Sequence, residues 1–365
     1  MRDDLFDRAG IVCPRCRRPG EGGMIQAPLR TKQVCRKEGD FYLEGLLECA
    51  DPVCGATYPV VDGVPVVLKD IGSWWRHAKP ALSEARAVGP EIRGYFETLE
   101  GNGREEIEGR SLLGSYMDFH YGEFTGAPAA PDPAACASNG AYWETVVGMA
   151  RPKSGMRYGR SLDLGSSVGR FTFEVARFSD LAVGLDLDFG KVTAAARIQR
   201  NRNVAHERRE HGRSFRRIEG AFDPPQNVLF LVGDALDPPF PAGSFDLVGA
   251  LNLLDNVGVP LMLLGQMDAL LRDGGIMLLG NPYEWRTEIA DPAEWLETET
   301  VDAPSFLRRI LEGVELARTG LRFTVEEEHT EVPWILRGHA RRWTLFLSHM
   351  IKARKERQGC PRRDE

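Results

Sequence analysis

A short segment with two glycines, at residues 163–169, restricts the possible folds of this chain more than any other feature. It reads Asp163-Leu-Gly165-Ser-Ser167-Val-Gly169 and directly follows a short apolar run. The glycines permit a tight turn and a close approach of the backbone, and such a turn delivers a ligand to the N-terminus of the following helix. The spacing differs from the dinucleotide motif Gly-x-Gly-x-x-Gly, because Gly165 and Gly169 are four residues apart. The segment therefore predicts a ligand-binding turn between a strand and a helix.

Short apolar runs alternate with amphipathic stretches between residues 160 and 350. We expect strands at Ser161–Leu164, Leu181–Leu187, Val228–Val232, Phe245–Leu251 and Gly275–Leu279, and helices starting near Gly169 and over Leu261–Leu271. This alternation predicts an α/β fold with a doubly wound, Rossmann-like parallel sheet and helices on both faces.

Polar residues follow these predicted strands in order. Asp186 ends the second strand, where an acid is placed to hold both hydroxyls of a ribose. Gly233-Asp234-Ala235 follows the third strand, and Asn252 follows the fourth. With the glycine turn, this series resembles the class I S-adenosylmethionine-dependent methyltransferases, with Ser167 in place of the middle glycine of their first motif. Another nucleotide-binding sheet is the alternative interpretation.

The resemblance implies a set of cofactor contacts. It places Asp186 on the ribose, Asp234 on the exocyclic amine of the adenine, and Asn252 on the reactive side of S-adenosyl-L-methionine. It also implies a terminal antiparallel hairpin, formed by Leu321–Val325 and Thr344–Ser348. The implied cofactor-binding residues are Asp163, Gly165, Ser166, Ser167, Gly169, Asp186, Leu187, Asp234, Ala235 and Asn252.

Several less common segments resemble one subgroup, the C-terminal methyltransferase domain of ovothiol synthase, which methylates an imidazole nitrogen. The segments are Tyr116–Gly122, Arg217–Gly220, Asn252–Asp255, Asn281–Trp285 and Pro333–Arg341. The resemblance spans about residues 112–352, without the sulfoxide-synthase part of that enzyme. The resemblance implies a small, polar methyl acceptor that contains nitrogen. It does not imply that this chain has the same role as ovothiol synthase.

The candidate residues for the chemistry follow from this acceptor. Methyl transfer is an in-line displacement, so alignment supplies much of the acceleration, and a neutral imidazole needs no strong base at pH 7. His120 and Tyr121 are candidates for accepting a proton or orienting the acceptor. Tyr283 is a third candidate catalytic residue. The candidate acceptor contacts are Asp255, Tyr283, Trp285 and Arg337, the last for a substrate carboxylate. Ordinary packing is the alternative for His120, Tyr283 and Trp285, and a helix cap is the alternative for Asp255.

Five of the seven cysteines lie in the first 54 residues. Two pairs, Cys13/Cys16 and Cys49/Cys54, have spacings that suit a tetrahedral structural zinc site, whereas Cys35 is a bystander. The opening Cys-Pro-x-Cys and the ending Tyr-Pro-Val-x-Asp-Gly-x-Pro-Val resemble the small zinc-ribbon activator subunit of tRNA, rRNA and release-factor methyltransferases. Four residues separate the second pair where that family has two, so four reduced thiols without metal are the alternative. Asp62-Gly63 predicts a hairpin.

A basic segment leaves a second class of acceptor open. Residues 197–217 contain eight arginines and two glutamates. With a zinc ribbon, this segment could bind RNA phosphates, which would make the chain a tRNA or rRNA methyltransferase with a cis-fused activator; a protein acceptor is a further alternative. A solvated basic helix explains the segment equally well.

The domain organisation follows from these motifs. We expect a zinc-ribbon-like module at 1–70, packed on the larger domain by Trp74 and Trp75, and a helical connector at 71–110. The methyltransferase domain should cover 111–352, including an irregular loop at Thr125–Ala137, and a charged, disordered tail should follow at 353–365. The net charge of −7 argues against a protein that generally coats nucleic acid. The charged start and the lack of long apolar runs predict a cytoplasmic location and no membrane contact.

Overall fold

The computed structural model describes most of the chain. The described residues are 1–20, 23–75, 88–90, 92, 95, 106–126, 139–153, 155–314 and 319–356. Most of the expected connector at 71–110, most of the expected loop at 125–137, Cys136, and the tail from residue 357 with Cys360 lie outside these residues. No helix within the described residues has the length and apolar character needed to cross a membrane.

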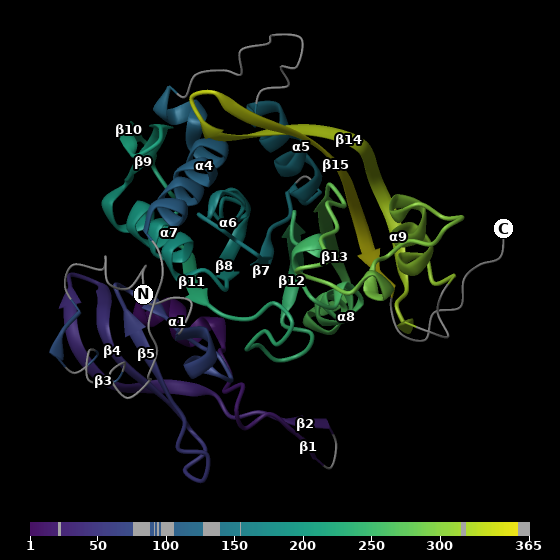
Figure 1. Ribbon diagram of the computed structural model, residues 1–365. Coiled ribbons are helices and arrows are strands. Elements are labelled where there is room, and N and C mark those ends of the chain that lie inside the picture. The colour runs from purple at the N-terminus through teal and green to yellow at the C-terminus, as the bar shows by residue number, and fades with distance from the viewer. Residues whose placement is uncertain are drawn as a thin grey trace.

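A seven-stranded sheet forms the centre of the larger domain (Figure 1). Its order is β11 (Val228–Val232), β8 (Ser179–Asp186), β7 (Tyr158–Leu164), β12 (Phe245–Leu251), β13 (Leu271–Asn281), β15 (Arg342–Lys355) and β14 (Phe323–His339). The first five strands are parallel, and β15 is antiparallel to both of its neighbours. This order confirms the predicted doubly wound sheet. The strand order reverses between β7 and β12, and open α/β sheets bind ligands at such a point.

The sequence explains why the central strands are parallel and covered. Every residue of β11 is buried, and β12 is buried from Phe245 through Ala250. Continuous apolar runs of this kind suit strands covered on both faces. The covering helices are α4 (Glu106–Thr125), α5 (Asn139–Ala150), α6 (Arg170–Ala176), α7 (Phe189–Asn201), α8 (Pro260–Leu270) and α9 (Ala303–Leu311).

The terminal hairpin is longer than its predicted core segments. β14 and β15 pair over nearly their whole length and reach α4 and α5, as the yellow ribbon in Figure 1 shows. Trp334 on β14 donates a hydrogen bond to Ser348 on β15 over 2.9 Å. Strand β15 runs through Lys355, so the expected boundary of the tail after residue 352 is wrong. Ladder hydrogen bonds to β13 hold this charged stretch in the sheet.

The N-terminal module contains a separate four-stranded sheet. It consists of α1 (Asp3–Ala9), a small ribbon of β1 (Arg18–Gly20) and β2 (Gly23–Ile25), and the sheet β3 (Leu29–Glu38), β4 (Phe41–Cys49), β5 (Thr57–Val61) and β6 (Val64–Pro65). Asp62 and Gly63 have φ angles of 49° and 83° between β5 and β6. Positive φ at both central residues gives the predicted two-residue hairpin turn. Helix α1 was not predicted.

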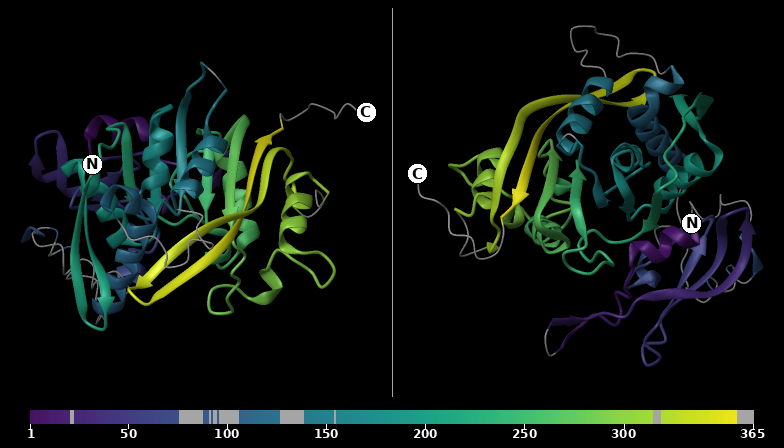
Figure 2. Two further views of the ribbon diagram at one scale, coloured as in Figure 1. Left: turned by 90° about the horizontal axis from the view of Figure 1, so that it is seen from above. Right: turned by 180° about the vertical axis from the view of Figure 1, so that it is seen from behind.

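The module joins the larger domain at the β11 edge of the sheet (Figure 2). Val66 pairs in parallel with Val232, and Val67 N donates to Val232 O over 2.9 Å. Trp74 makes the predicted packing contact, because its ring meets Phe189 edge-on and its Nε1 donates to Leu187 O over 2.8 Å. The module thus touches the turn that follows β8.

Two more ion pairs strengthen this joint. Asp62, in the hairpin turn of the module, pairs with Arg197 at 2.7 Å and with Arg200 at 2.9 Å. Both arginines lie on α7, which begins directly after β8. The α7 N-cap is Asp188, whose side chain accepts from Lys191 N over 3.1 Å. Asp188 is therefore a capping residue.

The basic segment does not form one helix. Only its first part belongs to α7, and the rest forms a hairpin of β9 (Asn203–His211) and β10 (Ser214–Ala221). The expectation of a solvated basic helix is therefore wrong. The β-branched and aromatic residues Val204, Phe215 and Ile218 alternate with charged ones here, and that period suits a strand.

Candidate active site

The turn after β7 has the backbone conformation that its glycines allow. Gly165 and Gly169 have φ angles of 73° and 86°, and Ser167 between them has a φ of 50°. A Cβ on Gly169 would lie 2.7 Å from the ring of Phe230, so this position accepts no side chain without movement. A serine in the left-handed region costs energy and is typical of functional turns. The turn therefore depends on both the conformation and the small size of its residues.

Asp186 ties the tip of β8 to this turn. Its Oδ2 accepts from Ser167 N and its Oδ1 accepts from Asp188 N, each over 2.8 Å. Burial raises the pKa of Asp186, although Lys191 nearby favours the charged form. The Oγ atoms of Ser166 and Ser167 are buried and have no hydrogen-bond partner within the described residues. Two orphaned hydroxyls beside a strand-end carboxylate fit the polar ribose and methionine parts of S-adenosylmethionine.

Two further side chains support the turn from inside the protein. Asp163 is 2% exposed and accepts from Thr172 Oγ1 over 2.6 Å, which links the end of β7 to α6. Burial raises the pKa of Asp163 to about 7. The fully buried Tyr121 of α4 donates its hydroxyl to Val168 O over 2.8 Å. The Tyr121 hydroxyl therefore holds the turn, and its proton already has an acceptor.

The remaining predicted cofactor residues lie at the ends of their strands. Asp234 follows β11, where its Oδ1 accepts from Leu236 N over 2.8 Å, and Ala235 beside it is half-buried. Leu187 follows Asp186 and is 52% exposed, so only its carbonyl is engaged, by Trp74. These residues surround the carboxyl edge of β11, β8 and β7.

Asn252 connects the end of β12 to the terminal hairpin. It has a φ of 52°, and its backbone N donates to Gly280 O over 2.6 Å. Its side-chain Oδ1 accepts from Ser348 Oγ over 2.9 Å, and its Nδ2 donates to Tyr142 over 3.3 Å. The conformation and the side chain of Asn252 are thus fixed from three elements.

Asp255 fixes the loop that carries Tyr283. Asp255 is 1% exposed, and its carboxylate accepts from Glu284 N over 2.7 Å and from Asn256 Nδ2 over 2.8 Å. Helix α8 begins with Val259 as N-cap and has no side-chain cap, so the alternative of a helix cap is wrong. Tyr283 itself has a φ of 57°. The carboxylate therefore holds a strained turn after β13.

His349 and Glu328 were not predicted, yet they contact a predicted residue. The Tyr283 hydroxyl lies 2.7 Å from His349 Nδ1, and His349 Nε2 lies 2.8 Å from Glu328 Oε1. Burial is the main reason that the pKa of Tyr283 is raised. The sequence signal was weak, a polar Ser348-His349 pair between the apolar pairs Phe346-Leu347 and Met350-Ile351 of β15.

His120 lies in a cluster of aromatic rings. Its ring is within 5.1 Å of Trp143 and 5.0 Å of Phe119, measured between centroids. It is 6% exposed, and its Nδ1 has no hydrogen-bond partner within the described residues. Burial, with Arg170 nearby, lowers the pKa of His120 well below its usual value, so this imidazole is neutral.

The last two predicted acceptor contacts differ in their surroundings. Trp285 is half-buried, stacks on Trp295 at 6.2 Å, and lies 6.1 Å from the ring of Tyr283. Arg337 is 5% exposed and pairs with Glu210 at 3.2 Å, with Asp118 at 3.7 Å. The guanidinium of Arg337 is thus already neutralised by protein carboxylates, unlike the expected carboxylate-binding arginine.

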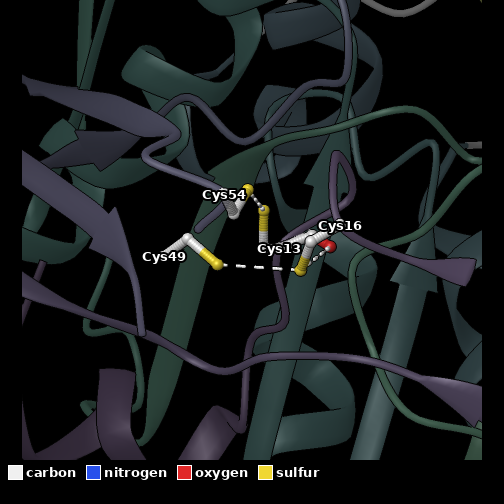
Figure 3. Close-up of side chains that lie close together, drawn as sticks. All are labelled: Cys13, Cys16, Cys49 and Cys54. Atoms are coloured by element: carbon white, nitrogen blue, oxygen red, sulfur yellow. Dashed lines mark hydrogen bonds between the residues drawn. The ribbon is translucent and has the colours of Figure 1, made fainter. Parts of the chain in front are cut away.

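The four predicted metal ligands meet in the N-terminal module (Figure 3). The sulfur atoms of Cys13, Cys16, Cys49 and Cys54 all lie within 4.8 Å of one another. Two of these separations are 3.7 Å and 3.6 Å. Zn–S bonds of about 2.3 Å in a tetrahedron require S···S separations of about 3.8 Å. Tyr58 Oη lies 3.1 Å from Cys13 Sγ, so one thiol has a hydrogen-bonding neighbour. The set fits a structural metal ion.

Comparison with known proteins supports the interpretation of the sheet. Residues 162–279 match the family model described as a methyltransferase domain. No curated protein matches the sequence.

Solved structures resemble the chain only distantly. A putative methyltransferase from Bacillus halodurans is 17% identical, covers 60% of this chain and 100% of its own, and has a TM-score of 0.38. A complex of the Haloferax volcanii Trm112 methyltransferase activator with a putative methyltransferase is 16% identical. The match covers 70% of this chain and 100% of that chain, with a TM-score of 0.40.

The matched segment runs from β7 to β13 and so contains the glycine turn, Asp186, Asp234 and Asn252. S-adenosylmethionine, when bound, supplies an electrophilic methyl group on sulfur. The protein is an S-adenosylmethionine-dependent methyltransferase.

Proposed function

We propose that this enzyme methylates a nitrogen of a small polar acceptor, of the imidazole class, at the carboxyl ends of β12 and β13. The observation that carries the proposal is the pair of half-buried aromatic residues Tyr283 and Trp285, held in one strained turn by Asp255. A flat or cationic ring can stack against such a pair. The Tyr283 hydroxyl adds a polar contact of fixed position.

The residues of this chain would contribute alignment rather than strong basicity. Asn252 and Tyr283 are both fixed in the left-handed region at the two strand ends that face the acceptor. Holding the acceptor nitrogen in line with the methyl carbon converts a bimolecular reaction into an effectively intramolecular one. A neutral imidazole supplies its own lone pair at pH 7.

The alternative acceptor is RNA, bound through residues 197–217, with protein as a further alternative. The charge balance of that segment favours the small molecule. Six of its eight arginines form ion pairs with carboxylates: Arg197, Arg200, Arg202, Arg208, Arg216 and Arg217. Arginines that are already paired with carboxylates neutralise fewer phosphates, and their binding therefore releases fewer of the counterions condensed on the RNA.

We also propose that the four-cysteine cluster holds a structural Zn²⁺ and that the module is a zinc ribbon. Four thiolates leave no open coordination position, so the metal would stabilise the module rather than act on substrate. Metal analysis of the purified full chain tests this, with Cys35→Ser as the matched control for Cys49→Ser. One zinc per chain that Cys49→Ser loses and Cys35→Ser keeps supports the proposal, and metal-free wild type with an intact fold would refute it.

A methylation screen tests the acceptor. The full chain is incubated with labelled S-adenosylmethionine and plain imidazoles, thiolated imidazoles or total tRNA. We expect label on an imidazole nitrogen and steep loss of that label in Tyr283→Ala. Label on tRNA alone, with binding that weakens steeply in salt, would instead support the RNA alternative.

A further inference from the structure

Three side chains from separate elements form a continuous hydrogen-bonded chain beside the end of β13. Tyr283 follows β13, His349 lies on β15 and Glu328 lies on β14. Both nitrogens of His349 are engaged, Nδ1 by the Tyr283 hydroxyl at 2.7 Å and Nε2 by Glu328 at 2.8 Å. His349 is 3% exposed. A buried imidazole between a hydroxyl and a carboxylate is an arrangement along which a proton moves.

The surroundings of His349 select one tautomer. An ionised carboxylate only accepts hydrogen bonds, so Glu328 requires a proton on Nε2, and Nδ1 then accepts from Tyr283. Arg308 forms an ion pair with the other oxygen of Glu328. Asp302, the N-cap of α9, is a further acidic group near His349. The described charged and titratable groups around His349 are therefore Glu328, Tyr283, Asp302 and, beyond Glu328, Arg308.

The chain of side chains ends at the acceptor side of the sheet. His349 is the register partner of Asn281, the last residue of β13. The preceding residue of that strand, Gly280, accepts the backbone hydrogen bond of Asn252. The Tyr283 hydroxyl is thus the outer end of a buried chain, and it lies close to the strand ends where the proposed acceptor binds.

We propose that His349 and Glu328 form a proton relay through which Tyr283 takes up the proton that the methyl acceptor releases. This inference rests on the proposed function, because it requires an acceptor that carries an N–H group. Tyr283 is the residue that would touch the acceptor, and His349 and Glu328 are positioning residues that act through it.

The step is balanced in protons and electrons. The acceptor nitrogen uses its lone pair to bond the methyl carbon, and the electron pair of the broken carbon–sulfur bond stays on sulfur. As the new bond forms, the N–H proton of the acceptor passes to the Tyr283 oxygen while the hydroxyl proton passes to His349 Nδ1. The imidazolium so formed is neutralised by Glu328, and the proton then returns to solvent.

Nitrogen-15 NMR of the histidine-labelled full chain tests the relay without any acceptor. We expect His349 to carry its proton on Nε2 at neutral pH, and Glu328→Gln to weaken this preference. A proton on Nδ1 in the wild type would overturn the proposal, since His349 could not then accept from Tyr283. His329, an exposed histidine that pairs with Glu327 on β14, is the internal control.

Single-turnover methylation of a thiolated imidazole supplies the functional test. We expect His349→Asn to slow the transfer about 100-fold, as for loss of general acid–base assistance, without a change in the Kd of S-adenosylmethionine. Glu328→Gln, which preserves size, should show a smaller loss.

The controls separate the two proposals. His329→Asn should leave the rate unchanged, and a His349→Asn rate equal to that of the wild type would overturn the relay. If the wild type methylates no imidazole, the proposed acceptor is wrong, and the tautomer of His349 still decides whether the relay exists.

Discussion

The two halves of the sheet hold their functional groups in different ways. On the proposed cofactor side, β7, β8 and β11, the candidate site is mainly backbone: Gly165, Ser167 and Gly169 shape one turn, and Asp186 accepts two backbone N–H groups. On the proposed acceptor side, β12, β13, β15 and β14, the candidate site consists of side-chain contacts such as Tyr283 with His349. The cofactor side therefore depends on local sequence, and the acceptor side depends on residues far apart in the chain.

The largest expected effect is on the cofactor side. Gly169→Ala should lower the free energy of unfolding by about 4 kcal/mol, because it adds a left-handed alanine and a clash with Phe230. Gly243→Ala is the matched control, since Gly243 also has positive φ but has nothing within 4 Å of the added Cβ. That variant should lose only about 1 kcal/mol. Urea denaturation measures both, and equal losses would mean that the turn is not tightly packed.

The next effect comes from the buried carboxyl of the same turn. The folded-state pKa of Asp163 is raised to about 7 from 3.8, so its stabilising contribution is complete below the unfolded pKa and is lost as pH rises through about 7. Asp163→Asn should abolish this loss. Relative to wild type, the variant should gain about 2.6 kcal/mol between pH 5 and pH 8. Urea titrations at several pH values check the slope, and a parallel pH dependence of the two proteins would contradict it.

On the acceptor side, Ser348→Ala should cost about 1.5 kcal/mol, because Trp334 and Asn252 both lose a hydrogen-bond partner. Methyl transfer should slow while the affinity for S-adenosylmethionine stays the same. Stopped-flow transfer rates and calorimetry separate the two quantities. A weakened affinity with an unchanged rate would contradict this, and would mean that Asn252 holds the cofactor without aligning the acceptor.

The smallest effect tests the contact with the N-terminal module. Trp74→Phe keeps the ring near Phe189 but removes the hydrogen bond to Leu187 O, at a cost of about 1 kcal/mol. Because this turn follows Asp186, we expect a severalfold weaker affinity for S-adenosylmethionine and an unchanged transfer rate. Trp295→Phe, at the opposite side of the sheet, is the control and should leave the affinity unchanged.

The same difference explains what the sequence predicted. The parallel strands, the glycine turn and the hairpin at Asp62-Gly63 follow from local patterns, and the structure confirms them. The number of charges in the basic segment allows a helix because it carries no information on periodicity, whereas the alternating apolar residues of this segment form a β-hairpin. Local sequence patterns were sufficient to predict the structure only where a segment is held by contacts between residues close together in the sequence.

The acceptor side could not be derived in this way. His349 and Glu328 are 66 and 45 residues from Tyr283 in sequence, and the pairing of β15 with both β13 and β14 brings the three together. Arg337 was predicted to hold a substrate carboxylate, whereas in the structure it pairs with Glu210 and Asp118, which come from distant elements. Contacts between distant segments follow from tertiary structure, which residue type and spacing do not reveal.

The central claim is that the turn after β7 and the tip of β8 bind S-adenosylmethionine, and calorimetry of the full chain tests it most directly. We predict that the wild type binds the cofactor and that Asp186→Ala weakens binding at least about tenfold, by loss of hydrogen bonds to a charged group. Asp188→Ala, which removes only the α7 cap, should retain the affinity. Failure of the wild type to bind, or equal binding by Asp186→Ala, would contradict the assignment.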